Sequence, residues 1–101
     1  MTKERFILFA DTLHDAIIEE FDSFEYEEYG KVETQEDLFI DWGNRLVKVR
    51  LWLIISCACD YITTIELDWI DIFDDELNDS IDDYSEELYG IVENAFSYKM
   101  L

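Results

Sequence analysis

Carboxylates are the residues of this sequence whose type and spacing point most directly to a function. Between residues 71 and 87 they recur three or four positions apart, the spacing that aligns side chains in rows on a helix. The candidate partner-binding site consists of Asp71, Asp74, Asp75, Glu76, Asp79, Asp82, Asp83, Glu86 and Glu87, with a second patch at Glu25, Glu27 and Glu28. Each like-charged pair on a helix costs ~0.2–0.5 kcal/mol. Residues 60–94 contain no Lys or Arg to relieve that repulsion, which indicates a cationic partner.

Nucleophilic catalysis is poorly supported by the remaining reactive side chains. The chain has one histidine, His14, on a predicted helix, and two thiols, Cys57 and Cys59, in and just after a predicted buried strand. A reactive thiolate needs an electropositive setting, which a net charge of -19 opposes. We therefore expect a surface or boundary histidine and reduced thiols.

The acidic residues do not match a known metal-binding pattern. An EF-hand needs an oxygen ligand at its third position and glycine at its sixth, but a loop starting at Asp71 has Phe73 and Glu76 there. No Cys/His spacing resembles a zinc site. With 26 acids, suitably spaced carboxylate pairs are inevitable and do not indicate acid–base catalysis. We expect neither an enzyme nor a protein that carries a cofactor or a dedicated metal ion.

Size and composition set the class of protein. The 101 residues suit a single domain, and a hydrophobic content of 50% is enough for a real core. The 26 acids against 7 bases exclude charge-driven binding to nucleic acid or to an anionic membrane. The apolar run Leu51–Ile55 is too short to cross a bilayer, and residues 1–21 lack the uninterrupted apolar core of a signal peptide. We expect a cytoplasmic location in a bacterial cell and a basic protein as partner.

The elements that position these carboxylates follow from hydrophobic periodicity. Three- and four-residue steps predict helices over residues 3–24 and 74–98. Alternating apolar residues predict strands over 38–42, 45–57 and 61–70, while 25–35 lack a period and are predicted as a loop. The expected α+β fold has the order α-β-β-β-α, with two helices covering the apolar face of a three-stranded antiparallel sheet.

The turns predict the register of the sheet. A two-residue turn at Gly43-Asn44, of type II′, places Asp37 opposite Arg50, and a three-residue turn at 58–60 places Asp68 opposite Arg50 from the other side. Alternation assigns these residues to the core face: Leu38, Ile40, Val47, Val49, Leu51, Leu53, Ile55, Ile65, Leu67 and Trp69. In the last helix Gly90 marks either close packing or a break, and Ser80 and Asp83 offer an alternative capped start.

Rows of carboxylates can take the place of phosphates in the groove of a DNA-binding protein. Duplex DNA presents one charge per ~1.7 Å of axis, and its binding proteins position Lys, Arg and helix N-termini to meet them. Exposed aromatic residues would add anchor contacts to such an interface; the candidates are Tyr26, Tyr29, Trp52 and Tyr84.

In size, acidity and compact α/β pattern the chain resembles the DNA-mimic inhibitors of phages and mobile elements, which include anti-CRISPR proteins, anti-restriction proteins and uracil-DNA glycosylase inhibitors. The stretch that carries the resemblance most clearly is DWIDIFDDELNDSIDDYSEEL, residues 68–88. The resemblance implies a stoichiometric inhibitor of a host nucleic-acid enzyme, a CRISPR-Cas effector being the first expectation. It is one of character across the chain and assigns no residue roles.

Two other functions would also explain the strongly acidic surface. An immunity protein that neutralises a nuclease toxin would be encoded directly beside that toxin. An acidic adaptor subunit would bind through apolar surface and keep its partner in ~0.5 M salt, where charges are screened within a few Å. A surface that is acidic only for solubility, including adaptation to high salt, is a further alternative, although a composition rich in Ile, Phe and Trp is not typical of salt adaptation. The sequence leaves the target, the inhibited step and the oligomeric state open.

Overall fold

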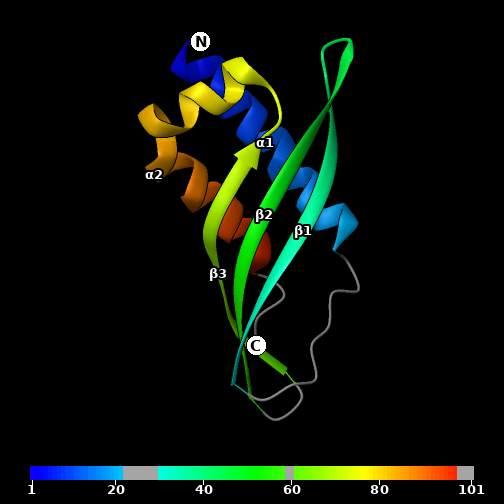
Figure 1. Cartoon of the computed structure of the whole chain (residues 1–101), viewed down its shortest axis with the longest axis vertical. Helices are drawn as coiled ribbons and strands as arrows, with labels where there is room; N and C mark the ends of the chain where they lie inside the picture. The colour runs from blue at the N-terminus through cyan, green and yellow to red at the C-terminus, as the bar shows by residue number, and fades with distance from the viewer. Residues whose placement is uncertain (22–29, 59–60, 98–101) are drawn as a thin grey trace.

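The chain folds as a helix, three antiparallel strands and a second helix (Figure 1). The computed structural model describes residues 1–21, 30–58 and 61–97. Its elements are α1 (Lys3–Glu20), β1 (Gly30–Trp42), β2 (Arg45–Ala58), β3 (Tyr61–Ile72) and α2 (Asp75–Ser97). The strands lie in the order β1-β2-β3. The predicted α+β fold and its α-β-β-β-α order are confirmed.

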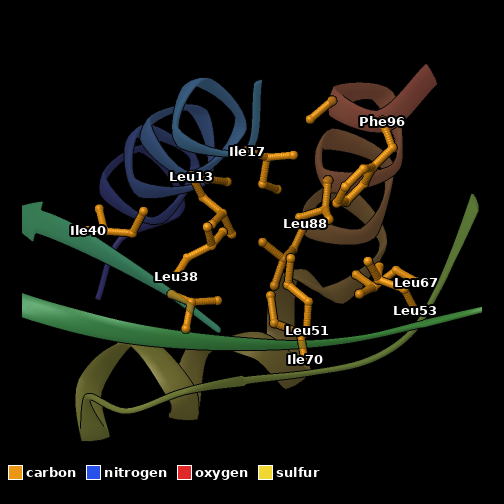
Figure 2. Close-up of a cluster of buried hydrophobic side chains, with 14 of the residues drawn as sticks. Leu13, Ile17, Leu38, Ile40, Leu51, Leu53, Leu67, Ile70, Leu88 and Phe96 are labelled. Atoms are coloured by element: carbon orange, nitrogen blue, oxygen red, sulfur yellow. The ribbon is translucent and has the colours of Figure 1, made fainter. Parts of the chain in front are cut away.

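The hydrophobic core lies between the helices and one face of the sheet (Figure 2). Helix α1 packs against β1, α2 packs against β3, and the two helices pack against each other. The buried side chains of α1 recur at helical spacing, as predicted: Phe6, Phe9, Ala10, Leu13 and Ile17. Thr2 caps this helix by accepting a hydrogen bond from the Arg5 amide (3.3 Å). The helix ends at Glu20, and residues 22–24 lie outside the described part of the chain.

The prediction of a loop over residues 25–35 is wrong for its described part. Residues 30–35 belong to β1 and pair with β2, from Gly30 opposite Cys57 to Gln35 opposite Trp52. No side chain of this half-strand is fully buried. Because no side chain here has to fill the core, the sequence of this segment needs no apolar alternation. The segment is a strand because its backbone pairs with β2.

The β1–β2 hairpin has the predicted register. Gly43 has a φ of +66°, the positive value that the turn requires. Asp37 lies opposite Arg50, and the guanidinium donates from Nε to Asp37 Oδ1 at 2.8 Å and from Nη2 to Oδ2 at 3.2 Å. This cross-strand pair was expected from the turn length alone.

The predicted β2–β3 register is wrong by three residues: Arg50 lies opposite Asp71 rather than Asp68. One residue of the shift arises because Ala58 pairs with Tyr61, which leaves two residues in the turn instead of three. The others are extra residues of β3 at two irregularities of the ladder, Thr63 and Asp68.

The second bulge also reverses which side chains face the core. Leu67 is buried before it and Ile70 is buried after it. Trp69, predicted on the core face, therefore points outward and is 57% exposed. The other predicted members of the core face are buried.

Helix α2 begins with Asp74 as its cap, since Asp74 Oδ1 accepts a hydrogen bond from the Leu77 amide (3.1 Å). The alternative start is wrong, because Ser80 lies inside the helix and its hydroxyl donates to the Glu76 carbonyl (3.0 Å). The helix is interrupted at Tyr84, whose φ of -128° and ψ of 26° are not helical. The prediction for Gly90 is also wrong, because a Cβ at this position would meet no atom within 4 Å and the helix continues through it.

Candidate partner-binding surface

Six of the nine predicted carboxylates of residues 71–87 are exposed on α2 and have no ion-pair partner among the described residues. We call this set the acidic ridge: Asp75, Glu76, Asp79, Asp82, Asp83 and Glu86. At a rise of 1.5 Å per residue the part of the ridge before the interruption at Tyr84, from Asp75 to Asp83, is about 12 Å long, so its five charges are spaced by about 3 Å along the helix. This spacing falls between the ~1.7 Å of both strands of duplex DNA and the ~3.4 Å of one strand.

The other three predicted carboxylates have partners within the protein. Arg45 Nη2 lies 2.7 Å from Asp74 Oδ2, and Lys3 Nζ lies 3.1 Å from Glu87 Oε1. A hydrogen bond from the backbone, and then Lys3, lower the pKa of Glu87. Asp71 accepts a hydrogen bond from Trp69 Nε1 (3.2 Å). The expectation that no cation relieves these carboxylates is therefore wrong for Asp74 and Glu87.

A groove of about 890 Å³ separates β3 from α2, and part of the acidic ridge forms its rim. The acids that line it are Asp71, Asp79, Asp82 and Glu86, and the aromatic residues are Trp69 and Tyr89. Burial, and then the charges of Asp68 and Asp71, raise the pKa of Tyr89, which keeps its hydroxyl protonated. Carboxylates beside aromatic rings are the surroundings that suit an arginine or lysine side chain.

A second groove runs between α1 and α2 on the other side of Glu86. Its lining combines apolar residues with acids and one cation: Lys3, Ile7, Asp11, Asp15, Glu86, Glu87 and Ile91. His14 lines it too and is partly buried, with Nδ1 3.3 Å from Asp15 Oδ1 and Nε2 3.4 Å from the Asn94 side-chain amide. This is the boundary histidine expected from the sequence.

The predicted aromatic anchors differ from those in the structure. Tyr84 packs on Phe6 with ring centroids 5.4 Å apart and is partly buried, so it belongs to the edge of the core. Trp52 lies half-buried on the sheet face away from the helices. The residues predicted at 25–29, namely Glu25, Tyr26, Glu27, Glu28 and Tyr29, lie outside the described residues.

Sequence reasoning missed two exposed aromatic residues beside the ridge, Trp69 and Phe73, which are 57% and 53% exposed. Trp69 lines the β3–α2 groove, and Phe73 adjoins the start of α2. One sequence signal could have indicated the outward position of Trp69. Two adjacent apolar residues, Trp69 and Ile70, follow an acid inside a strand, and such a break in alternation is typical of a β-bulge.

In residues 1–21, 30–58 and 61–97 no three His, Cys, Asp or Glu side chains are grouped so that they could hold a metal ion. Cys57 is a buried free thiol, and Cys59 lies outside this part of the chain. Neither α1 nor α2 is long and apolar enough to cross a membrane. The chain matches no family model, curated protein or solved structure.

Proposed function

We propose that this protein is a DNA-mimic inhibitor that occupies the nucleic-acid-binding surface of a basic host enzyme. A CRISPR-Cas effector is the first candidate for that enzyme. The observation that carries the proposal is the acidic ridge, six exposed carboxylates on one helix that form no ion pair within the described part of the chain. Such an arrangement destabilises the isolated helix, and a cationic groove on another protein offsets that cost.

The surroundings of the ridge support a protein partner with Lys and Arg side chains. The β3–α2 groove places Asp79, Asp82 and Glu86 beside the rings of Trp69 and Tyr89. An arginine that enters this groove can pair with a carboxylate and stack on a ring in one pose. Long-range attraction to a net charge of -19 would also speed association with a basic surface.

Charge reversal of the ridge tests the proposal. The variant Asp79→Lys, Asp82→Lys, Asp83→Lys and Glu86→Lys changes four exposed residues that make no ion pair among the described residues, so the fold is expected to persist. The matched control reverses four exposed acids of other elements, Glu4, Glu19, Glu20 and Asp41, and changes the net charge by the same amount.

Each protein is immobilised and used to capture partners from bacterial lysate at about 0.15 M salt, with mass spectrometry as the readout. We expect the wild type and the control to retain the same nucleic-acid-binding protein and the ridge variant to lose it. Retention should also fall steeply towards ~0.5 M salt as the charges are screened. Equal capture by the ridge variant, or a complex that persists at the higher salt, would instead favour the acidic adaptor.

A further inference from the structure

The groove between α1 and α2 lies beside the acidic ridge and shares only Glu86 with it. The two helices run in the same direction (Figure 1), so that Lys3 lies beside Glu87 and, further along, His14 lies beside Asn94. The part of each helix that lines the groove is about 12–18 Å long at a rise of 1.5 Å per residue. The groove has a volume of about 950 Å³ and is as long as two or three turns of a helix.

Gly90 is the least expected residue of this groove. Glycine disfavours a helix interior, and no contact within the described chain requires it here. Its φ is not positive, and a Cβ at this position would meet no atom within 4 Å. Gly90 is exposed and lines the groove next to Ile91. The missing side chain leaves room for another molecule to approach the helix closely, and an occupant of the groove therefore gives this glycine a purpose.

The groove combines apolar surface with negative charge. Ile7 of α1 and Ile91 of α2 are half-buried in its lining, whereas three acids of the lining are exposed. Two of these acids, Asp11 and Glu86, form no ion pair among the described residues. The third, Asp15, has only the neutral or protonated ring of His14 beside it, at 3.3 Å. An occupant with apolar side chains between basic ones matches this pattern.

We propose that the α1–α2 groove binds an amphipathic helix that has an apolar stripe with Lys or Arg on either side. The backbone groups of α1 and α2 bond within their own helices, so the groove offers no ladder of hydrogen bonds to an extended peptide. A helix satisfies its own backbone, and its apolar stripe can lie over Ile7, Gly90 and Ile91. The inference rests on the proposed function only for the source of this helix, which we assign to the same basic enzyme.

A designed peptide tests the docking without the enzyme. It has about 14 residues, with leucine at every third or fourth position and lysine or alanine elsewhere, so that as a helix it has one apolar stripe. The control peptide has the same composition in an order that forms no stripe, and it represents the rival occupant, a basic segment held by charge alone.

Fluorescence anisotropy measures both peptides with the intact protein at about 0.15 M NaCl. We expect a dissociation constant on the order of 10 µM for the amphipathic peptide and about tenfold weaker binding of the control. Equal affinities, or no binding of the amphipathic peptide, would overturn the proposal.

Isoleucine methyl groups locate the bound peptide. In the NMR spectrum of methyl-labelled protein, the signals of Ile7 and Ile91 should shift as the amphipathic peptide is added, because both residues line the groove. Ile81 lines the β3–α2 groove instead and should shift little. Shifts of Ile81 without shifts of Ile7 and Ile91 would place the peptide beside the acidic ridge and contradict the inference.

Variants of Gly90 test its part in the groove. Gly90→Leu should weaken binding of the amphipathic peptide by about tenfold or more, whereas Thr12→Leu, on α1 outside the groove lining, should leave it unchanged. Gly90→Ala should raise the urea midpoint and yet weaken the peptide several-fold, a combination that a damaged fold does not produce. Wild-type affinity in both Gly90 variants would overturn the proposal, with circular dichroism checking the fold of each.

The docking and the proposed function can fail separately, because the designed peptide is not a nucleic-acid enzyme. Loss of DNA competition would contradict phosphate mimicry by the ridge without affecting the peptide result, and a peptide that does not bind would contradict the groove alone. Where both hold, the enzyme captured from lysate should bind Gly90→Leu more weakly than wild type.

Discussion

Arg50 shows how a single cation is used in a chain where acids far outnumber bases. Its guanidinium donates to both oxygens of Asp37, lies 6.0 Å from the Trp52 ring and 5.3 Å from the Phe73 ring, and faces Asp71 across the sheet. The hydrogen bond to Asp37 raises the pKa of Arg50 and lowers that of Asp37. The Arg50 side chain thus lies between the carboxylates of Asp37 on β1 and Asp71 on β3 and reduces their repulsion. It also covers part of the Trp52 and Phe73 rings.

Asp37→Asn is expected to lower the urea midpoint at pH 7, because it removes the carboxylate that Arg50 and Lys48 share. A lowered pKa means that folding favours the ionised carboxyl. Its contribution is therefore present above the ordinary aspartate pKa of about 3.9 and is lost as the pH falls through the folded-state value. The difference between wild type and variant should therefore shrink as the pH falls below about 4.

Asp41→Asn is the control for that prediction. Asp41 is exposed on the same strand, and no ion pair holds it among the described residues. Its urea midpoint should match the wild type or exceed it slightly, since one repelling charge is removed. A loss of stability as large as that of Asp37→Asn, at neutral pH, would contradict the role given to the Arg50 pair.

At the level of elements, local patterns determined most of the fold. Helix spacing, the Gly43 turn and the alternation of β2 were sufficient for both helices and for the register of the first hairpin, but residues 30–35 of β1 were predicted as a loop. The bulge at Thr63 leaves no sign in the local composition, and the bulge at Asp68 is marked only by the adjacent apolar residues Trp69 and Ile70. That bulge moved Trp69 from the core to the surface.

The candidate site was predicted in part for a similar reason. The rows on α2 follow from helical spacing alone, so six carboxylates could be assigned to an exposed ridge. The cations that neutralise Asp74 and Glu87 come from Arg45 and Lys3. These lie far away along the chain, and only the packing of the elements brings them near.

Gly90, inside α2, and Gly43, in the β1–β2 turn, test the assignment of these two elements by opposite effects on stability. Gly90→Ala should stabilise the protein by about 0.5–1 kcal/mol, because alanine favours a helix interior and a Cβ there meets no atom within 4 Å. Gly43→Ala should destabilise it by about 1 kcal/mol, because its φ of +66° disfavours a Cβ. Chemical denaturation measures both, and changes of equal sign would contradict the assignments.

At the level of the whole molecule, self-repulsion dominates the electrostatics. A net charge of -19 on 101 residues opposes the compact state, and added salt screens that repulsion. We expect the melting temperature to rise by several degrees between about 0.01 M and 0.5 M NaCl; about 1 kcal/mol corresponds to ~4–8 °C at this size.

The ridge variant is the control for this salt effect. Its four reversals each change the charge by two, so the net charge falls from -19 to -11 and the rise in melting temperature should be smaller. A melting temperature of the wild type that falls with salt would mean that favourable ion pairs outweigh the repulsion, which would contradict this account of the charge.

Competition with DNA is the most direct test of phosphate mimicry by the acidic ridge. The nucleic-acid-binding protein captured from lysate is purified and bound to fluorescently labelled duplex DNA, and this complex is titrated with the wild type and with the ridge variant. The anisotropy should fall to that of free DNA near one equivalent of wild type, with no displacement by the variant. DNA that stays bound while the wild type binds the same complex, or equal displacement by both proteins, would contradict the central claim.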